Sequence, residues 1–246
     1  MDKHTAVVVG VGAEAGLGAA ICRRFAAGGY HVLVAGRTQA KIDQVAARIR
    51  ETGGSAESVL TDTTDEAQVL RLFDRAMAPG PGLQPVDVVV FNAGNNRPIK
   101  FRELEAAQFE DFWRVGCYAG FLVGREAARR LAPLGRGTVL FTGASGSLRG
   151  KPDYAHFAVA KAGLRAIAQS MAREFGPLGL HVAHVVIDGG VKGERLLSAV
   201  PQLAQMRGPD GLLEIEAIAE TYWQLHQQPR SAWTQEIDLR PYKEPF

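Results

Sequence analysis

The feature that most constrains this chain is a glycine-rich segment that directly follows a short apolar run near its N-terminus. Residues 6–9 are Ala-Val-Val-Val, and residues 10–18 are Gly-Val-Gly-Ala-Glu-Ala-Gly-Leu-Gly. Between a buried strand and a helix, glycines allow a tight turn, close approach of the backbone to a pyrophosphate, and close packing of helix on strand. The free N–H groups at the start of such a helix also suit phosphates. We therefore predict a dinucleotide site that includes Gly12, Glu14, Gly16, Leu17 and Gly18.

The rest of the chain predicts a parallel sheet covered by helices, because short β-branched runs alternate with longer amphipathic segments. Strands are expected at residues 5–11, 31–35, 55–60, 86–91, 137–142, 180–187 and 234–240. Helices are expected at residues 16–27, 39–51, 66–77, 109–131 and 154–175. Strand alternation resumes directly after the Pro-Gly-Pro-Gly stretch at 79–82, which favours a loop over a domain boundary. We expect a single α/β domain over residues 1–246, a Rossmann-type doubly wound sheet of about seven strands with helices on both faces.

Composition and charge argue against several kinds of partner. The net charge at pH 7 is only +2 and lysines and arginines do not cluster, so neither nucleic acid nor membrane is an expected partner. Because no apolar stretch has the length of a signal peptide or a membrane span, we expect a cytoplasmic protein. Cys22 and Cys117 lie far apart, and His181 and His184 would point to opposite faces of a strand, so no disulfide and no metal site is expected.

The glycine spacing resembles that of one family. Gly12-x-x-x-Gly16-x-Gly18 differs from the common Gly-x-Gly-x-x-Gly pattern and resembles the cofactor loop of the short-chain dehydrogenase/reductase family. The resemblance covers nearly the whole chain. Further matching positions are Asp62 after the third strand, Asn92-Ala93-Gly94 after the fourth, and Lys161 on a long helix. The resemblance implies that these residues contact a nicotinamide dinucleotide, and that Asp62 contacts the adenine of that cofactor.

The end of the second predicted strand indicates which dinucleotide is bound. In NAD-binding folds an acid about 20 residues beyond the glycines holds the ribose 2′-hydroxyl. This chain has Gly36 there, followed by Arg37, whose guanidinium suits a 2′-phosphate. An exposed turn arginine without a ligand is the alternative. We predict that NADP(H) is preferred over NAD(H).

The catalytic pattern of the resembled family is incomplete in this chain. That family uses an Asn–Ser–Tyr–Lys set, in which tyrosine passes a proton to the substrate oxygen and serine hydrogen-bonds the same oxygen. The resemblance assigns the lysine role to Lys161, but Phe157 stands at the tyrosine position, Ala144 at the serine position and Cys117 at the asparagine position. A benzyl ring cannot donate a proton, and a methyl group cannot hydrogen-bond an oxyanion.

Two nearby hydroxyl groups are candidates to replace the missing ones. Tyr154 lies seven positions before Lys161, which places it on the same helical face if the helix has already begun. A packed or interfacial tyrosine is the alternative. Ser145 directly follows the serine position and could turn into the site, although strand alternation directs neighbouring side chains to opposite faces.

Two functions remain open from the sequence. The first is an NADP(H)-dependent oxidoreductase with an atypical catalytic site, and the second is an inactive NADP(H)-binding or regulatory protein that kept the cofactor pocket. Asp188-Gly189 replaces the family's Pro-Gly at the end of the sixth strand, where such folds place ligands, and we expect contact with cofactor or substrate there. Residues 191–210 are expected to cover a small-molecule substrate whose identity the sequence does not indicate.

Small residues recur at close to four-residue spacing on two of the predicted helices. They are Gly116, Gly120 and Gly124 on one helix, and Ala155, Ala158, Ala162, Ala166 and Ser170 on the other. Such stripes let helices approach closely, and in the resembled family these two helices pair between subunits. The sequence therefore predicts a homodimer or homotetramer. Packing of both stripes against the chain's own sheet is the alternative.

Overall fold

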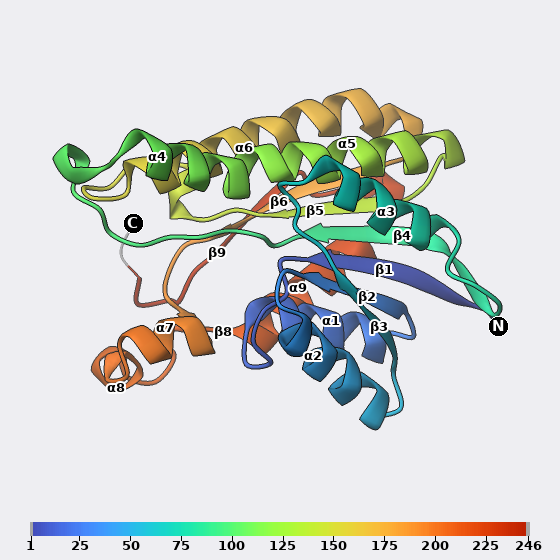
Figure 1. Cartoon of the computed structure of the whole chain (residues 1–246), viewed down its shortest axis with the longest axis horizontal. Helices are drawn as coiled ribbons and strands as arrows, with labels where there is room; N and C mark the ends of the chain where they lie inside the picture. The colour runs from blue at the N-terminus through green and yellow to red at the C-terminus, as the bar shows by residue number, and fades with distance from the viewer. Residues whose placement is uncertain (1, 245–246) are drawn as a thin grey trace.

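In the computed structural model, which describes residues 2–244, seven parallel strands form one sheet in the order β3-β2-β1-β4-β5-β6-β9 (Figure 1). The strands are β1 (Lys3–Val9), β2 (His31–Gly36), β3 (Ser55–Leu60), β4 (Leu83–Phe91), β5 (Thr138–Thr142), β6 (His181–Ile187) and β9 (Glu236–Leu239). The chain builds outward from β1 to β3 and then returns to place β4 on the other side of β1. This reversal confirms the predicted doubly wound sheet and opens a crevice at the carboxyl ends of β1 and β4.

Helices cover both faces of the sheet, as predicted (Figure 1). One face is covered by α3 (Glu66–Met77), α5 (Ala119–Leu131) and α6 (Ala155–Phe175), and the other by α1 (Leu17–Ala27), α2 (Gln39–Glu51) and α9 (Ile215–His226). The alternation within β1 explains why both faces need a cover. Ala6 and Val8 lie in one buried core and Val7 and Val9 in the other. Burying each such valine contributes about 1.5–3 kcal/mol, so the sheet is stable only with helices on both sides.

Several element boundaries differ from those expected, among them the start of the fourth strand, which lies at Leu83 and not at residue 86. The helix expected over residues 109–131 is interrupted: α4 (Ala106–Trp113) leads through a π-helical turn, Arg114–Tyr118, into α5. The first strand ends at Val9, because Gly10 has a φ of +79° that an extended strand does not allow. The last strand covers only Glu236–Leu239 of the expected 234–240.

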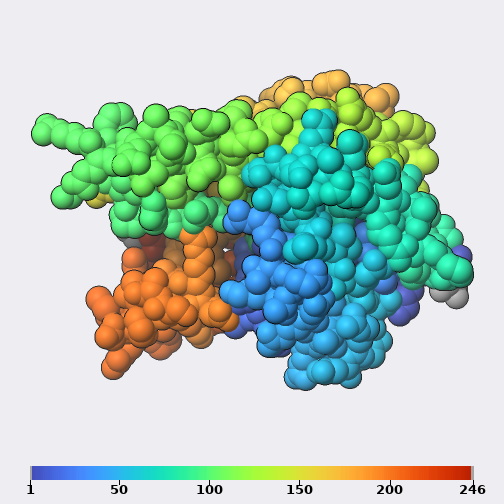
Figure 2. Space-filling model, in the orientation of Figure 1, coloured from blue at the N-terminus to red at the C-terminus, as the bar shows by residue number. Residues whose placement is uncertain are grey.

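The helix that follows the predicted cover was not expected from the sequence, nor were the short elements within that cover, which was predicted for residues 191–210. The helix is α9, although its buried residues Ile215, Ile218, Ala219, Tyr222 and Leu225 have helical spacing. We use the name cover segment for residues 191–214, which contain β7 (Val191–Lys192), α7 (Glu194–Ala199), α8 (Leu203–Arg207) and β8 (Leu213–Glu214). Figure 2 shows the molecular surface hollowed between this segment, in orange, and the green region around α4. None of the helices within residues 2–244 combines the length and apolar character of a membrane-spanning helix.

Candidate active site

The glycine loop packs directly on the turn that follows β4. A Cβ atom on Gly10 would collide with the backbone of Asn92 and Ala93, so only glycine fits there. A Cβ on Gly18 would lie 3.1 Å from Gly10 O and from Asn92 Nδ2. Gly12 differs, because no atom lies within 4 Å of its Cβ position, which leaves that part of the loop open to a ligand. Leu17 opens α1 and packs against the core.

The Asn92 side chain ties three strand ends together. Its Nδ2 donates to Gly10 O at 3.3 Å, and its Oδ1 accepts from Thr142 Oγ1 at 3.2 Å. The Thr142 hydroxyl is also 2.7 Å from the Tyr222 hydroxyl of α9. Asn92 therefore fixes the edge of the crevice between β1 and β4 by joining it to β5.

Lys161 lies at the same edge and is almost fully buried. Its ammonium donates to Thr142 O at 2.6 Å, and the Nζ atom is only 3.2 Å from the position of a Cβ on Gly94. A side chain at position 94 would therefore crowd the ammonium. Burial lowers the pKa of Lys161 to about 8, and the neighbouring Arg195 guanidinium adds to this lowering. The structure thus brings together Asn92, Gly94 and Lys161, which the sequence assigned to one site.

The three altered catalytic positions hold groups with no replacement chemistry of their own. The Phe157 ring packs on Gly146, 2.9 Å from its Cβ position, in the turn that begins after Ala144. Cys117 lies in the π-helical turn, is 7% exposed, and packs on Gly163. Burial raises the pKa of the Cys117 thiol, which keeps it protonated and unreactive.

The two candidate hydroxyls lie beside these positions. Helix α6 begins at Ala155, so Tyr154 precedes it and the expectation of a shared helical face with Lys161 is wrong. The Tyr154 ring instead meets the Phe157 ring edge-on, with centroids 6.4 Å apart. Ser145 is the first residue of a 3₁₀ turn. Within residues 2–244 neither hydroxyl has a side-chain hydrogen-bond partner, so both stay candidates as proton donors.

A buried polar chain, not expected from the sequence, supports the turn that carries Ala144 and Ser145. The Ser147 hydroxyl accepts from Ala144 N at 3.1 Å and lies 3.2 Å from His184 Nε2. His184 Nδ1 is 3.0 Å from Glu236 Oε2. Burial lowers the pKa of His184 to about 4, so its ring is neutral near pH 7 and accepts from Ser147 while donating to Glu236.

Ser147, His184 and Glu236 follow one another in the order serine, histidine, acid that serine hydrolases use. The serine and histidine side chains are buried, however, which favours a structural role. Ser147 is 5% exposed and His184 fully buried, so the hydroxyl has little access to a substrate. Glu236 is further held by two hydrogen bonds from Arg165, at 2.6 and 2.7 Å. A Cβ on Gly143 would collide with the His184 ring, which explains the glycine at that position.

Two arginines hold the Asp188 side chain, and the predicted contact of Asp188 and Gly189 with cofactor or substrate stays a prediction. Its carboxylate is 1% exposed and accepts from Arg149 Nη2 at 2.8 and 3.0 Å. Arg240 Nη2 lies 3.1 Å from the same carboxylate. Gly189 is likewise covered, because a Cβ there would lie 2.6 Å from the Cδ of Pro241.

The predicted adenosine end of the cofactor site is a cavity of about 380 Å³, lined by Arg37 and Asp62 and also by Asn95. The Asp62 carboxylate accepts from the backbone and hydroxyl of Thr64, at 2.9 and 2.8 Å. Arg37 is exposed, and a Cβ on Gly36 would collide with Val11 O. This backbone therefore has no room for the acid that holds the ribose of NAD.

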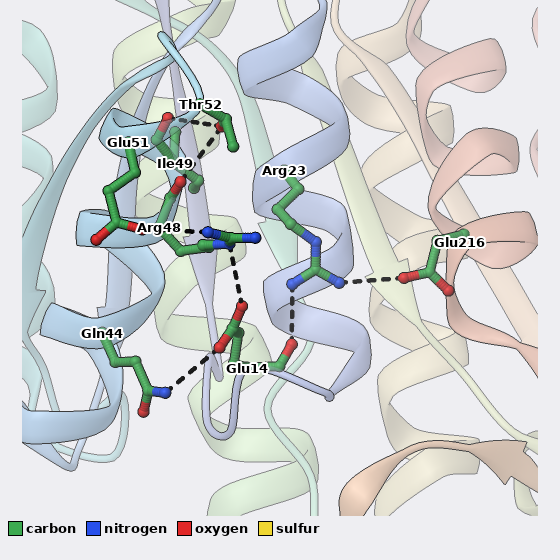
Figure 3. Close-up of polar contacts among 8 residues, drawn as sticks. All are labelled: Glu14, Arg23, Gln44, Arg48, Ile49, Glu51, Thr52 and Glu216. Atoms are coloured by element: carbon green, nitrogen blue, oxygen red, sulfur yellow. Dashed lines mark hydrogen bonds and ion pairs between the residues drawn. The ribbon is translucent and has the colours of Figure 1, made fainter.

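Glu14, predicted to belong to the cofactor-binding loop, turns its side chain away from that loop. Figure 3 shows its carboxylate directed toward α2, where it lies 3.3 Å from Gln44 Nε2 and 3.8 Å from Arg48 Nε. The Glu14 carbonyl accepts from Arg23, which also pairs with Glu216 of α9 at 3.1 Å. These contacts tie the loop to α2 and leave the backbone of Glu14, and not its carboxylate, to a cofactor.

Comparison with known proteins agrees with this arrangement. The model of the short chain dehydrogenase family matches residues 5–197. Cis-4-hydroxycyclohexanecarboxylate dehydrogenase of Sinomonas cyclohexanicum is 32% identical over 177 residues, which cover 72% of this chain and 70% of that enzyme. The uncharacterized oxidoreductase YuxG of Bacillus subtilis (strain 168) is 31% identical over 188 residues, but these cover 75% of this chain and only 27% of that protein.

A solved structure extends the likeness beyond the matched segment. The crystal structure of a short-chain dehydrogenase from Rhodopseudomonas palustris has a TM-score of 0.82 and 38% sequence identity, and the match covers 97% of this chain and 99% of that one. The overall fold therefore agrees with that of a solved relative, and the segment that matches the family model contains the glycine loop, Asn92 and Lys161. This chain belongs to the short-chain dehydrogenase/reductase family.

Proposed function

We propose that this chain is an NADP(H)-dependent oxidoreductase with an altered proton-donating site. The observation that carries the proposal is the meeting of Lys161 and Gly94 at the crevice between β1 and β4, where doubly wound sheets bind ligands. The residues present fit a dinucleotide: the open Gly12 and the start of α1 suit a pyrophosphate, and the cavity at Arg37 and Asp62 suits the adenosine end. A dehydrogenase name among the relatives also supports an oxidoreductase.

Each side chain of the site has its own role in the proposed reaction. When bound, the cofactor supplies or accepts the hydride of the reaction. Lys161 would hold the nicotinamide ribose through its ammonium, which Thr142 O already orients. Phe157 and Ala144 would exclude water from the reacting atoms without exchanging a proton. The proton must then reach the substrate oxygen from another group, and Tyr154 and Ser145 are the nearby candidates.

Cofactor preference is the first test. NADPH is expected to bind several-fold more tightly than NADH in a fluorescence titration. Replacing Arg37 with alanine should weaken NADPH binding by about 1.5–3 kcal/mol, the range for a hydrogen bond to a charged group, and leave NADH nearly unchanged. Arg173→Ala, an exposed arginine near the end of α6, serves as the matched control. Equal affinities of the unmodified protein for the two cofactors would contradict the preference.

We also propose that the protein is a homo-oligomer. The three glycines of the stripe face α6 of the same chain: Gly116 faces Ala160, Gly120 faces Leu164 and Gly124 faces Met171. The glycine stripe therefore packs inside one subunit, and not at the interface for which it was predicted. The stripe on α6 supports the proposal instead. Its later members Ala162, Ala166 and Ser170 are exposed, and Val159 beside them is 45% exposed. Exposed small and apolar residues on one helix suit close contact with a second subunit.

Light scattering at micromolar concentration is expected to give the mass of a dimer or tetramer. Ala162→Arg should lower that mass, because a long cation would separate two closely packed helices. Ala40→Arg on the exposed face of α2, on the other side of the sheet, should not change it. A monomer for the unmodified protein would refute the proposed assembly.

A further inference from the structure

Arg195 reaches from the cover segment across the hollow to the opposite wall of the crevice. It lies in α7, and its Nη2 donates to Asn95 Oδ1 at 2.9 Å and to Asn96 O and Oδ1 at 2.7 and 3.0 Å. Its Nη1 is 3.5 Å from Gly94 O. Since Gly94 also borders the Lys161 ammonium, two cations stand on the two sides of one glycine.

These two cations have no negative partner. Within residues 2–244, no carboxylate forms an ion pair with Arg195 or with Lys161, and the acceptors of their hydrogen bonds are neutral oxygens. By contrast, Arg149 at the other side of the site is matched by the buried Asp188. Lys161 is buried, whereas Arg195 is exposed and reaches across the hollow, where partial desolvation lowers its pKa. A guanidinium that holds only neutral acceptors gains from a carboxylate that replaces them.

We propose that Arg195 binds a carboxylate of the substrate, so that the substrates of this protein are hydroxy or oxo acids. This inference rests on the proposed oxidoreductase function. The pyrophosphate of a dinucleotide is the other possible source of negative charge, but its place is at the glycine loop and the start of α1. Arg195 instead lies against Gly94, which borders Lys161, at the end of the crevice where the nicotinamide would lie, although its partner Asn95 also lines the cavity of Arg37 and Asp62.

The binding mode follows from the guanidinium. Its planar fork matches the two oxygens of a carboxylate, and an incoming carboxylate would replace the amide oxygens of Asn95 and Asn96. The charge of Lys161 adds attraction at the same point. Because Arg195 is carried by the cover segment, an acid bound there would also hold that segment against the wall formed by Asn95 and Asn96.

The test is calorimetric titration of the NADPH-saturated protein with tartrate and gluconate, and with threitol and sorbitol as their uncharged counterparts. We expect binding of at least one acid and of neither polyol. Arg195→Gln should weaken acid binding about 10–100-fold, as expected for loss of a charge-assisted pair, while NADPH affinity changes less than about threefold. Arg195→Lys should recover part of the loss. Arg207→Gln, an exposed arginine on the same segment, is the control and should bind as the unmodified protein does.

The possible failures are distinct. If Arg195→Gln weakens NADPH as much as it weakens the acid, the arginine serves the pyrophosphate and the inference is overturned. The same holds if the unmodified protein binds NADPH but neither acid, or binds each acid no better than its polyol. If NADPH itself does not bind, the proposed function fails, and the substrate class fails with it.

Discussion

With NADPH bound, the unmodified protein is expected to reduce simple ketones and aldehydes at least about 10³-fold more slowly than a family member with the full catalytic set. Loss of a general acid typically costs 10²–10⁴-fold, and loss of an oxyanion donor about 10²–10³-fold. The two penalties overlap, because residues that act as a unit are not additive. Here Phe157 packs on Gly146, in the turn that follows Ala144. The missing tyrosine and serine hydroxyls would therefore both have been at this turn.

Restoring both groups should raise the rate. Phe157→Tyr with Ala144→Ser places a hydroxyl at each position, and we expect faster turnover of some small carbonyl, provided that Cys117 does not block the proton path. Phe121→Tyr is the matched control, because it adds the same hydroxyl to a ring of α5 that is 42% exposed. The readout is oxidation of NADPH followed by absorbance, with the carbonyl panel run on all variants.

Two results would redirect this interpretation. If the unmodified protein turns over carbonyls at rates usual for intact family members, another residue is the general acid, and Tyr154→Phe is the next variant to measure. An undiminished rate of that variant would exclude Tyr154 as the general acid. If NADPH binds but the double variant and the unmodified protein are equally inert, the inactive NADP(H)-binding or regulatory protein becomes the better description.

The fold was predictable because its signals are local. The alternation of Val7 and Val9 against Ala6 and Val8 marks a strand buried on both faces, and such a strand in first place with a glycine loop behind it predicts a doubly wound sheet. The buried residues of α9, such as Ile218 and Tyr222, also have helical spacing, so this helix is predictable in the same way. The π-helical turn could not be predicted, because a single extra residue hardly disturbs the apolar period of the flanking helices.

The site was predictable only where a residue follows a strand or a known motif. Asn92 and Lys161 meet because parallel strands bring their carboxyl ends to one edge of the sheet. The pairing of His184 with Glu236 joins residues that are 52 positions apart and depends on the register of β6 with β9. No local sequence pattern indicates how β6 and β9 are aligned. The turn of Glu14 toward α2 is likewise a choice of side-chain direction that spacing does not determine.

Replacing Asp188 with alanine is expected to cost about 2–4 kcal/mol of the free energy of unfolding. Removing one partner of a buried ion pair typically costs 3–5 kcal/mol, because the other charge loses its counterpart. Here the side chain of Asp188 is 1% exposed, whereas those of Arg149 and Arg240 are 37% and 15% exposed. Water can therefore reach part of the remaining positive charge, which places the expected cost at the lower end of that range or somewhat below it.

Asp238→Ala is the matched control for this variant. Asp238 pairs with the same Arg240, at 2.7 Å, but its side chain is 36% exposed. An exposed ion pair contributes at most about 1 kcal/mol, so the control should change stability little. Urea unfolding followed by circular dichroism measures both free energies, and the Asp188 variant should also lower the thermal midpoint by roughly 5–15 °C. Equal losses for the two variants would show that burial of the Asp188 carboxylate does not set its contribution.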